Sequence, residues 1–516
     1  MSKLFLVRFL LVGIFITPGF ALSNTDKLFQ THCSSCHGAD RLGGVGPALL
    51  PENLTRLKKK EAVSVIGSGR AATQMPAFEK ILTSEQIISL VDMIYTPLAS
   101  VPPWGMEQIG KSQILHHDVA KLSAKPVFTA DPMNLFIVVE IGDHHVTLLD
   151  GDSFTPIHRF ASRFALHGGP KYSPDGRFVY FASRDGWISK YDIYNLTLVS
   201  EVRAGINTRN AAVSGDGRYV MVANYLPHTL VVLDATDLSP LKVIPVTDDK
   251  GTSSRVSAVY DAGPRNSFIA ALKDIPEVWE IPYSDNPEPI YPGLVHDYRM
   301  GEGLQVKGPF PVRRIRLTDY LDDFFFDQSY EHLIGAARNG NNGQVINLLV
   351  GKKIADIDLP GLPHLGSGIT WDYKGTTVLA TPNLKSSEVS IIDMLTWKTI
   401  KRLKTLGPGF FMRSHENSRY AWVDVFFGPN KDAVHIIDKK KLKIVKTLRP
   451  APGKTAAHVE FTRDGAYALL SIWEMDGALV IYDARTLKEV KRLPMKKPSG
   501  KYNVHNKIMR SEGTSH

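Results

Sequence analysis

Val146-Thr147-Leu148-Leu149-Asp150, an apolar run that ends in an aspartate, decides the fold because the same pattern recurs along the chain. The aspartates of the successive repeats are separated by 42, 42, 159, 45 and 45 residues. The long gap has room for two degenerate units, near residues 278–281 and 345–349, so the repeat predicts eight units. The five later segments of the same form are Ile188-Ser189-Lys190-Tyr191-Asp192, Leu230-Val231-Val232-Leu233-Asp234, Val389-Ser390-Ile391-Ile392-Asp393, Val434-His435-Ile436-Ile437-Asp438 and Leu479-Val480-Ile481-Tyr482-Asp483.

Several units also contain a turn signal. The examples are Ser173-Pro174-Asp175-Gly176-Arg177, Ser214-Gly215-Asp216-Gly217-Arg218 and Thr462-Arg463-Asp464-Gly465. Asp-Gly between alternating apolar runs predicts a hairpin. Units of this length with several short strands are typical of propeller blades, whereas a β-sandwich would not repeat so regularly. We therefore predict an all-β, eight-bladed propeller over residues 126–516, with most repeat residues in the blade cores.

A second decisive stretch holds the only two cysteines of the chain: Thr31-His32-Cys33-Ser34-Ser35-Cys36-His37. C-x-x-C-H is the spacing at which a c-type heme is attached, with thioethers from Cys33 and Cys36 and the imidazole of His37 on the iron. A thioredoxin-like dithiol would need a βαβ context, and a zinc site would usually bring further cysteines. The sequence has neither, so we expect one covalent heme c.

Residues 24–100 predict a small all-α domain around this motif. A helix-compatible segment leads into the motif, and Asn53 is the expected cap of a second helix. Thr83 and Gln86 form a capping box for a third helix, whose apolar face is Ile87, Leu90, Val91 and Ile94. The pattern resembles a class I cytochrome c.

The heme iron needs a second axial ligand, and Met75 is the candidate. It lies in Gln74-Met75-Pro76-Ala77-Phe78, just before the third helix and 38 residues after His37. A thioether ligand raises the potential and suits electron transfer. The alternatives are a gap-filling buried methionine at this position and ligation by His32, which sits too close to the motif to reach the opposite face of the heme.

The N-terminus predicts export. Lys3 and Arg8 precede an apolar run over residues 9–16, and Pro18, Gly19 and Ala21 follow, so residues 1–23 are typical of a cleaved signal peptide. The run is too short to span a bilayer, so we expect a periplasmic protein that does not span the membrane. Residues 101–125, which open on prolines, are the expected linker.

The formal net charge of +9 comes with only short basic clusters, at residues 58–60, 313–316 and 439–443. They predict solvated loops. Aromatic residues do not alternate with them as on a nucleic-acid surface, so we expect no nucleic-acid partner. A mild attraction to an acidic electron acceptor in the periplasm remains consistent with the charge.

Taken together, these parts resemble the cytochrome cd1 nitrite reductase family over essentially the whole mature chain. Pro102-Pro103-Trp104-Gly105-Met106 is similar to the family linker, and Pro498-Ser499-Gly500-Lys501-Tyr502-Asn503-Val504 is similar to its closing segment. In that family the central face of the propeller binds the modified tetrapyrrole heme d1 without a covalent bond. The resemblance therefore implies a second, non-covalent heme site in this chain.

The resemblance also implies roles for individual residues. His167 matches the histidine that ligates the heme d1 iron, and His364 matches one of two distal histidines that give protons to nitrite. The other distal histidine corresponds to Tyr320-Leu321-Asp322-Asp323, where an aspartate replaces it. Three basic positions, Arg184, Arg209 and Arg255, match those that hold the heme d1 carboxylates, and their alternative is ordinary surface ion pairing.

The aspartate changes the expected chemistry. Two histidines can supply the protons that nitrite reduction consumes, whereas a carboxylate is ionised at neutral pH and repels an anion. His458 also stands where the reductases are basic but have no histidine. This distal side resembles that of the dihydro-heme d1 dehydrogenases, which complete heme d1 by oxidising a propionate to an acrylate. The resemblance implies His364 as the base and His458 as a second distal group or ligand, although the two roles stay interchangeable.

This reading implies dihydro-heme d1 as the substrate, electron exit through heme c, and the nitrite reductase as a recipient of finished heme d1. Two alternatives stay open. One is a nitrite reductase with a variant distal pocket. The other is a carrier that delivers heme d1 and performs no chemistry, although a carrier has no need of an electron outlet.

Overall fold

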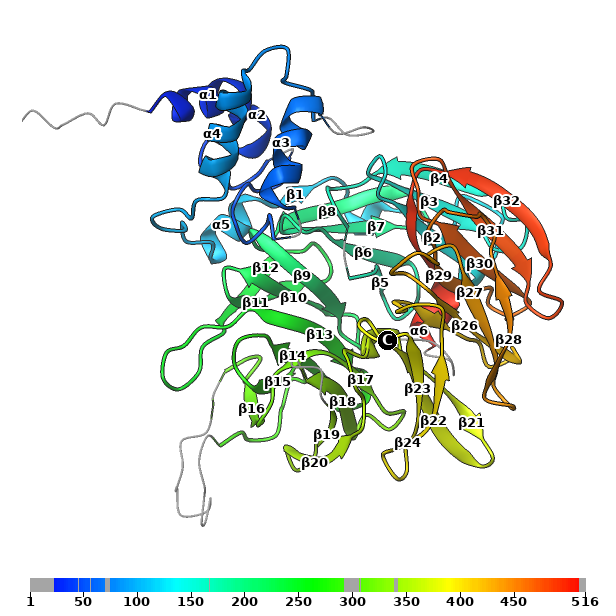
Figure 1. The fold of residues 1–516 in the computed structure, drawn as a ribbon. Helices are drawn as coiled ribbons and strands as arrows, with labels where there is room; N and C mark the ends of the chain where they lie inside the picture. Colours follow the sequence, from blue (N-terminus) through cyan, green and yellow to red (C-terminus); the bar gives the residue numbers. More distant parts are fainter. Residues whose placement is uncertain are drawn as a thin grey trace, which may run out of the picture.

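In the computed structural model, eight antiparallel sheets form a ring, and a helical domain lies against one edge of the ring (Figure 1). The structure describes residues 23–44, 46–55, 57–69, 75–166, 168–291, 306, 308–337 and 342–509. The expected signal peptide lies outside this part of the chain except for its last residue. The predicted order, an all-α domain followed by an eight-bladed propeller, is confirmed.

The apolar-aspartate repeat forms the third strand of each blade, which explains why it is the most regular part of the sequence. Neighbouring blades pack on both faces of this strand, so it reads as a continuous apolar run; on β11, Leu230 and Val232 face one neighbour and Val231 and Leu233 face the other. The two degenerate units are third strands as well. These strands are β3 (His145–Asp150), β7 (Trp187–Asp192), β11 (Thr229–Asp234), β15 (Glu277–Pro282), β19 (Gly343–Asn347), β23 (Glu388–Asp393), β27 (Val434–Asp438) and β31 (Gly477–Asp483).

The Asp-Gly turns join the first and second strands of their blades, as predicted. Gly176, Gly217 and Gly465 all have φ of +74°, the left-handed conformation that glycine adopts without strain. The second strands are β2 (Leu135–Glu140), β6 (Phe178–Ala182), β10 (Tyr219–Leu226), β14 (Ser267–Leu272), β18 (His332–Ala337), β22 (Thr376–Pro382), β26 (Tyr420–Asp424) and β30 (Tyr467–Ile472).

The innermost strands surround the centre of the ring, and the last of them closes it. β33 (Pro498–Asn503) pairs with β2, so the C-terminal segment completes the first blade. α6 (Val504–Ile508) follows it. The other inner strands are β5 (Lys171–Tyr172), β9 (Asn207–Val213), β13 (Val256–Ala262), β17 (Leu321–Phe326), β21 (Ile369–Tyr373), β25 (Met412–Arg413) and β29 (Ala456–Phe461).

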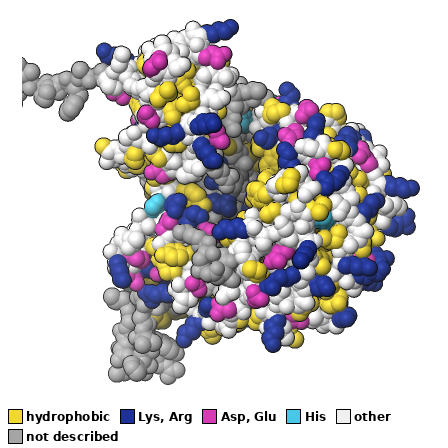
Figure 2. Space-filling model, viewed as in Figure 1, with side chains coloured by type: hydrophobic (Ala, Val, Ile, Leu, Met, Phe, Trp, Pro, Cys, Tyr) yellow, Lys and Arg dark blue, Asp and Glu magenta, His cyan; other side chains and the backbone are white. Residues whose placement is uncertain are grey.

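The outer strands are rich in lysine and arginine, and Figure 2 shows basic side chains along the rim of the ring. Charged side chains on an edge strand discourage pairing with another chain. The prediction of solvated basic loops is wrong in part: Arg313 and Arg314 lie on a strand and pair with Glu280 and Glu277, and Lys439 is buried. The outer strands are β4 (Pro156–Ala161), β8 (Thr197–Arg203), β12 (Pro240–Pro245), β16 (Arg313–Arg316), β20 (Lys352–Ile357), β24 (Lys398–Lys404), β28 (Lys443–Leu448) and β32 (Glu489–Met495).

The helical domain contains α1 (Asn24–His32), α2 (Ser34–His37), α3 (Lys59–Ser68) and α4 (Ser84–Ile94). The capping box of Thr83 and Gln86 is present, and the predicted apolar face of α4 is buried. The second predicted helix begins later than expected, at Lys59. Asn53 does not cap it, because its side-chain amide donates to the carbonyl of Ile206 in the propeller at 3.2 Å.

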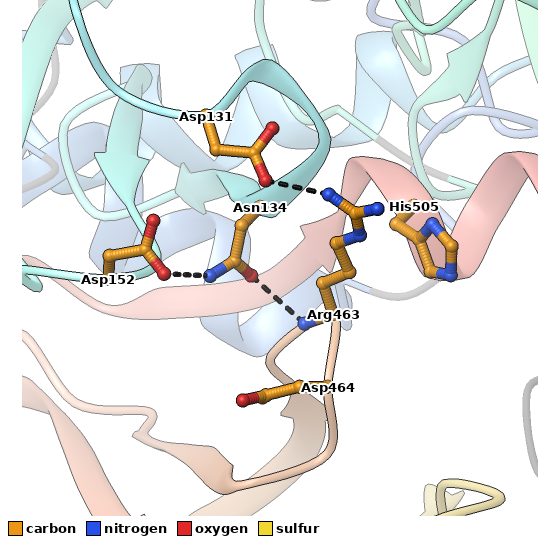
Figure 3. Close-up of a pocket in the computed structure, with 6 residues that line it drawn as sticks. All are labelled: Asp131, Asn134, Asp152, Arg463, Asp464 and His505. Atoms are coloured by element: carbon orange, nitrogen blue, oxygen red, sulfur yellow. Dashed lines mark hydrogen bonds and ion pairs between the residues drawn. The ribbon is translucent and has the colours of Figure 1, made fainter.

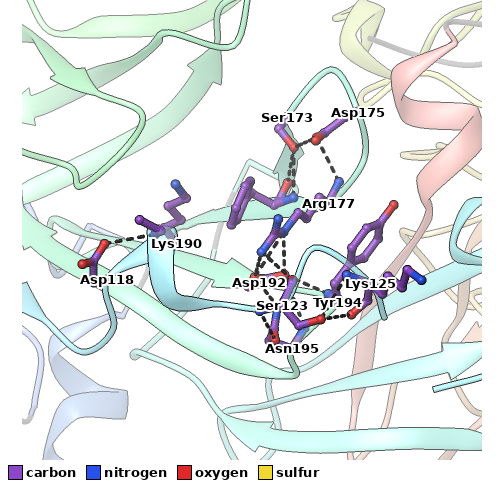
Figure 4. Close-up of polar contacts among 12 residues, drawn as sticks. Asp118, Ser123, Lys125, Ser173, Asp175, Arg177, Lys190, Asp192, Tyr194 and Asn195 are labelled. Atoms are coloured by element: carbon purple, nitrogen blue, oxygen red, sulfur yellow. Dashed lines mark hydrogen bonds and ion pairs between the residues drawn. The ribbon is translucent and has the colours of Figure 1, made fainter. Parts of the chain in front are cut away.

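The linker is more structured than its prolines suggested. It contains α5 (Met106–Lys111) and β1 (Ile114–Leu115), and β1 adds a fifth strand to the blade of β8. Its end is tied to the same blade, because Arg177 and Asn195 both donate to the carbonyl of Ser123, at 3.0 and 2.9 Å (Figure 4). None of the described helices is long and apolar enough to cross a membrane.

Candidate active site

The cysteine motif lies where α1 ends and α2 begins, and its histidine is held in one orientation. His37 is 9% exposed, and its Nδ1 donates to the carbonyl of Pro47 at 2.8 Å. A carbonyl can only accept, so this bond leaves Nε2 as the free, unprotonated nitrogen. Burial lowers the pKa of His37, which keeps the imidazole neutral and able to bind a metal. A Cβ on Gly46 would lie 2.8 Å from the ring of His37, so any residue other than glycine at this position would clash with the imidazole.

Two other predicted heme c residues pack on the apolar core of the helical domain. Cys33 and Met75 both pack against the apolar cluster of Phe29, Leu54 and Phe78. Both cysteines are free and half-buried, and burial raises the pKa of the Cys33 thiol to about 11. His32 lies at the margin, with its ring edge-on to Phe78. The chemistry of these donors fits a heme c attached through the two cysteines.

The second candidate site lies where the inner strands of the propeller begin. His364 precedes β21, and its side chain is 17% exposed. Its Nδ1 donates to the carbonyl of Phe410 at 2.6 Å, and the two rings are 4.3 Å apart. As at His37, this bond fixes the tautomer and leaves Nε2 as the basic nitrogen. Burial lowers the pKa of His364, and the positive charge of Arg209 lowers it further.

The aspartate expected in place of a distal histidine is Asp323, on β17. Its Oδ2 lies 3.8 Å from Nε2 of His364. Its neighbour Asp322 points elsewhere and pairs with Lys273 at 2.7 Å. Three donors hold the Asp323 carboxylate: the hydroxyl of Tyr260 at 3.0 Å, the backbone amide of Phe324 at 3.0 Å and that of Gly366 at 2.9 Å.

His458 lies on β29 in an unusual backbone conformation. Its φ is +55°, and it forms a bulge between Ala457 and Val459, which pair with β30 on either side of it. Burial lowers the pKa of His458 well below its ordinary value, and Lys501 and Arg413 add to the effect. The imidazole is buried, and its Nδ1 has no hydrogen-bond partner among the described residues. An orphaned buried nitrogen of this kind fits a bound ligand such as a tetrapyrrole.

Aromatic rings enclose His458. Phe411 lies 4.8 Å from its ring, and Tyr502 on the closing strand lies 5.1 Å away. Burial raises the pKa of the Tyr502 phenol, so this side chain is protonated. In the sequence, Tyr502 stands out only as part of the closing segment. Only the closure of the ring brings it to His458.

The three predicted arginines lie on neighbouring blades. The backbone amide of Arg184 donates to Ala165, and the amide of Thr208, beside Arg209, donates to Arg184, each at 3.2 Å. Arg184 thus lies beside Ala165, and Arg209 follows the residue that contacts Arg184. Arg255 is already paired, with two hydrogen bonds of 2.8 and 2.7 Å to Asp274. His167 itself lies outside the described residues.

A pocket of about 320 Å³ lies elsewhere, near the turn at the far end of β29 from the site (Figure 3). Its polar lining is partly satisfied internally, since Arg463 pairs with Asp131 at 2.8 Å and Asn134 bonds Asp152 at 2.8 Å. None of the predicted site residues lines it. We therefore place the candidate site at the histidines and not in this pocket.

The helical domain packs on the propeller through the loop that follows the cysteine motif. Leu42, Ala48 and Leu50, from the loop after the cysteine motif, form one apolar cluster with Ile206 and Leu226. The same loop contains Pro47, which holds His37. The segment that binds the proximal histidine is therefore seated directly on the propeller.

Arg203 fixes this contact. Its side chain donates to the carbonyl of Leu42 in the helical domain and to that of Asp185 in the propeller, the latter at 2.9 Å. The guanidinium also lies 4.9 Å from the ring of Trp104, whose Nε1 donates to the carbonyl of Arg203 at 2.9 Å. The linker, the loop after the cysteine motif and the blade of β8 thus all contact the buried guanidinium of Arg203.

Comparison with known proteins agrees with this architecture. Residues 130–297 and 303–507 match the cytochrome D1 heme domain, and residues 21–94 match the model described as cytochrome C oxidase, cbb3-type, subunit III. The protein NirF of Pseudomonas aeruginosa is 28% identical over 383 residues, which cover 72% of this chain and 91% of that protein.

Two further matches extend over nearly the whole chain. The dihydro-heme d1 dehydrogenase of Pseudomonas aeruginosa is 55% identical over 507 residues, 98% of each chain. A solved structure of dihydro-heme d1 dehydrogenase NirN in complex with DHE superposes with a TM-score of 0.88 at 55% identity, over 94% of this chain and 99% of that one. The chain therefore belongs to the dihydro-heme d1 dehydrogenase family, and its propeller is a cytochrome D1 heme domain.

Proposed function

We propose that this protein is a periplasmic dihydro-heme d1 dehydrogenase, which oxidises a propionate side chain of the tetrapyrrole to an acrylate in the last step of heme d1 formation. The substrate loses two protons and two electrons. One proton goes to a protein base and the second to solvent. Heme c, held by Cys33 and Cys36, would accept the electrons one at a time and supply the outlet to a periplasmic acceptor.

One observation carries the proposal: both distal histidines are held neutral. Burial lowers the pKa of His364 and of His458, so at neutral pH each is in the unprotonated form, which has a nitrogen that can accept a proton and no imidazolium proton to give. Removing hydrogen from a substrate needs an acceptor, whereas reducing nitrite needs donors. The distal side therefore favours dehydrogenation over nitrite reduction.

His364 is the base in this proposal. Its Nδ1 proton is committed to Phe410, so Nε2 accepts the proton from the propionate carbon. The carboxylate of Asp323, 3.8 Å away, then stabilises the imidazolium. His458 is the proposed second distal group, and its unpartnered Nδ1 would contact the bound tetrapyrrole. Arg184, Arg209 and Arg255 are the proposed partners of the substrate carboxylates, and His167 is the proposed proximal ligand.

Heme c supplies a one-electron acceptor when it is bound to Cys33 and Cys36. His37 and Met75 are the proposed axial ligands. The helical domain must be held in a fixed position on the propeller. The apolar cluster around Ile206 and the hydrogen bonds of Arg203 hold it there. A carrier of finished heme d1 would have no use for this arrangement.

The proposal places the signal peptide at residues 1–23, the cytochrome c domain at 24–100, the linker at 101–125 and the propeller at 126–516. The proposed recipient of finished heme d1 is the cytochrome cd1 nitrite reductase. No nucleic acid takes part.

Anaerobic incubation of the purified holoprotein with dihydro-heme d1 tests the proposal. We expect the mass of the tetrapyrrole to fall by two hydrogen atoms while heme c becomes reduced. Tight binding without a change of mass would identify a carrier. Nitric oxide formed from nitrite at the rate of a nitrite reductase, without conversion of dihydro-heme d1, would identify a reductase.

A further inference from the structure

A single buried carboxylate joins the segment that contains His458 to the segment that binds His364. Asp424 ends β26 and is 1% exposed. Its Oδ1 accepts the backbone amides of Phe410 and Phe411, at 2.8 and 3.1 Å. Its Oδ2 accepts the backbone amide of His458, at 3.2 Å. The carboxylate thus bonds directly to His458 and reaches His364 through Phe410, whose carbonyl accepts from His364.

The bulge at His458 makes the third of these bonds necessary. His458 is skipped in the pairing of β29 with β30, so its amide has no partner strand. A non-glycine residue at a φ of +55° is strained and persists only where its surroundings hold it. Asp424 holds the amide, and Lys501 donates to the carbonyl of the same residue. The strained residue is thus held from both sides.

The contacts of Asp424 also position the aromatic rings that pack on the two histidines. Phe410 and Phe411 follow each other on the segment held by Oδ1. The ring of Phe410 packs on His364 at 4.3 Å, and the ring of Phe411 packs on His458 at 4.8 Å. A shift of this segment would therefore move both imidazoles together. Residues that are held this firmly around reacting groups set the geometry on which rates depend.

We infer that Asp424 is a positioning residue that fixes His364 and His458 relative to each other, through the amides of Phe410, Phe411 and His458. The inference rests on the proposed dehydrogenase function, within which it explains how two loops from different blades keep one geometry. Asp424 does not touch the substrate in this account.

The chemistry of the contact suggests an isosteric test. In Asp424→Asn, the amide oxygen can still accept from Phe410 and Phe411, but the amide nitrogen then faces the amide of His458. Two donors cannot bond, so this variant releases the bulge selectively. Asp438→Asn is the matched control, because Asp438 lies in the same blade, is 1% exposed and accepts two backbone amides, at 3.0 Å each, far from the histidines.

The experiment loads each holoprotein with dihydro-heme d1 under anaerobic conditions. For Asp424→Asn we expect an altered absorption and paramagnetic resonance spectrum of the bound tetrapyrrole, a kcat lower by about 10-fold or more, and a Kd close to that of the wild type. Asp438→Asn should match the wild type in all three. An Asp424→Asn variant with the wild-type spectrum and kcat would overturn the inference.

A second measurement uses the wild type and does not depend on how well the variant folds. The amide of His458 lies outside the ladder, so it exchanges rapidly with deuterium unless Asp424 holds it. We expect it to exchange slowly and at the same rate as the amides of Phe410 and Phe411. Rapid exchange at His458 would refute the link. If the wild type binds dihydro-heme d1 without converting it, the proposed function fails, whereas the spectral comparison and the exchange rates still report on Asp424.

Discussion

The Nε2 atom of His364 lies 3.8 Å from Oδ2 of Asp323. Nδ1 of the same ring is committed to the carbonyl of Phe410. The imidazole is therefore fixed in one tautomer, with its basic nitrogen beside a carboxylate. In the proposed mechanism, this nitrogen is the one that accepts the proton of the substrate.

Replacing His364 with alanine should abolish conversion while leaving binding intact. A positioned base contributes about 10²- to 10⁴-fold to a rate, so we expect kcat to fall by that factor. His332→Ala is the control, because this histidine pairs with Asp327 at a blade turn at 2.8 Å and has no place in the mechanism. Conversion at an unchanged rate in His364→Ala would remove His364 as the base.

The pH dependence of the rate should report the lowered pKa of His364. His364 must be neutral to accept a proton, and burial lowers its pKa below the ordinary 6.5. The rate should therefore stay level down to about pH 6.5 and fall only below it. The Asp323 charge raises this pKa, so Asp323→Asn should move the acid limb to lower pH and lower the plateau. An acid limb that moves upward in Asp323→Asn would contradict this account.

The contact between the domains should govern electron exit. Arg203→Met leaves the carbonyls of Leu42 and Asp185 without their donor, at a cost of about 1–3 kcal/mol for each. We expect slower reduction of heme c in stopped-flow experiments, with unchanged binding of the tetrapyrrole. Arg218→Met, at an exposed ion pair with Asp216, serves as the control. Equal rates in Arg203→Met and the wild type would mean that this contact does not limit electron transfer.

The ligand of heme c opposite His37 can be tested by its potential. A thioether ligand raises the potential relative to a second imidazole, so Met75→His should lower the midpoint potential and slow the uptake of electrons. Met93 packs in the same core cluster as Met75, and Met93→Leu should leave the potential unchanged. A potential that does not change in Met75→His would exclude Met75 as a ligand.

Much of the fold could be predicted from the sequence because it depends on local sequence patterns. The third strand of each blade is buried on both faces, so its apolar run recurs with little variation, and even the degenerate units at residues 278–281 and 345–349 were assigned correctly. The capping box at Thr83 is equally local. Asn53 was assigned wrongly, because a cap and a side chain that reaches another domain have the same local sequence.

The geometry of the site was less accessible because it depends on contacts between distant residues. The family resemblance implied an aspartate in place of a distal histidine, but the sequence did not show which of Asp322 and Asp323 lies beside His364. Arg203 and Leu42 are 161 residues apart, and no pattern links them. The bulge at His458 gives no signal in the sequence either, since Ala457-His458-Val459 reads as an ordinary strand.

The stoichiometry of one reaction tests most directly whether heme c takes up the electrons lost by dihydro-heme d1. Oxidised holoprotein in excess over dihydro-heme d1 should reduce two hemes c for each tetrapyrrole that loses two hydrogen atoms, because each chain has one C-x-x-C-H motif and each heme c takes one electron. The absorbance of heme c and the mass of the extracted tetrapyrrole measure the two quantities. Heme c that stays oxidised, or a tetrapyrrole of unchanged mass, would contradict the account.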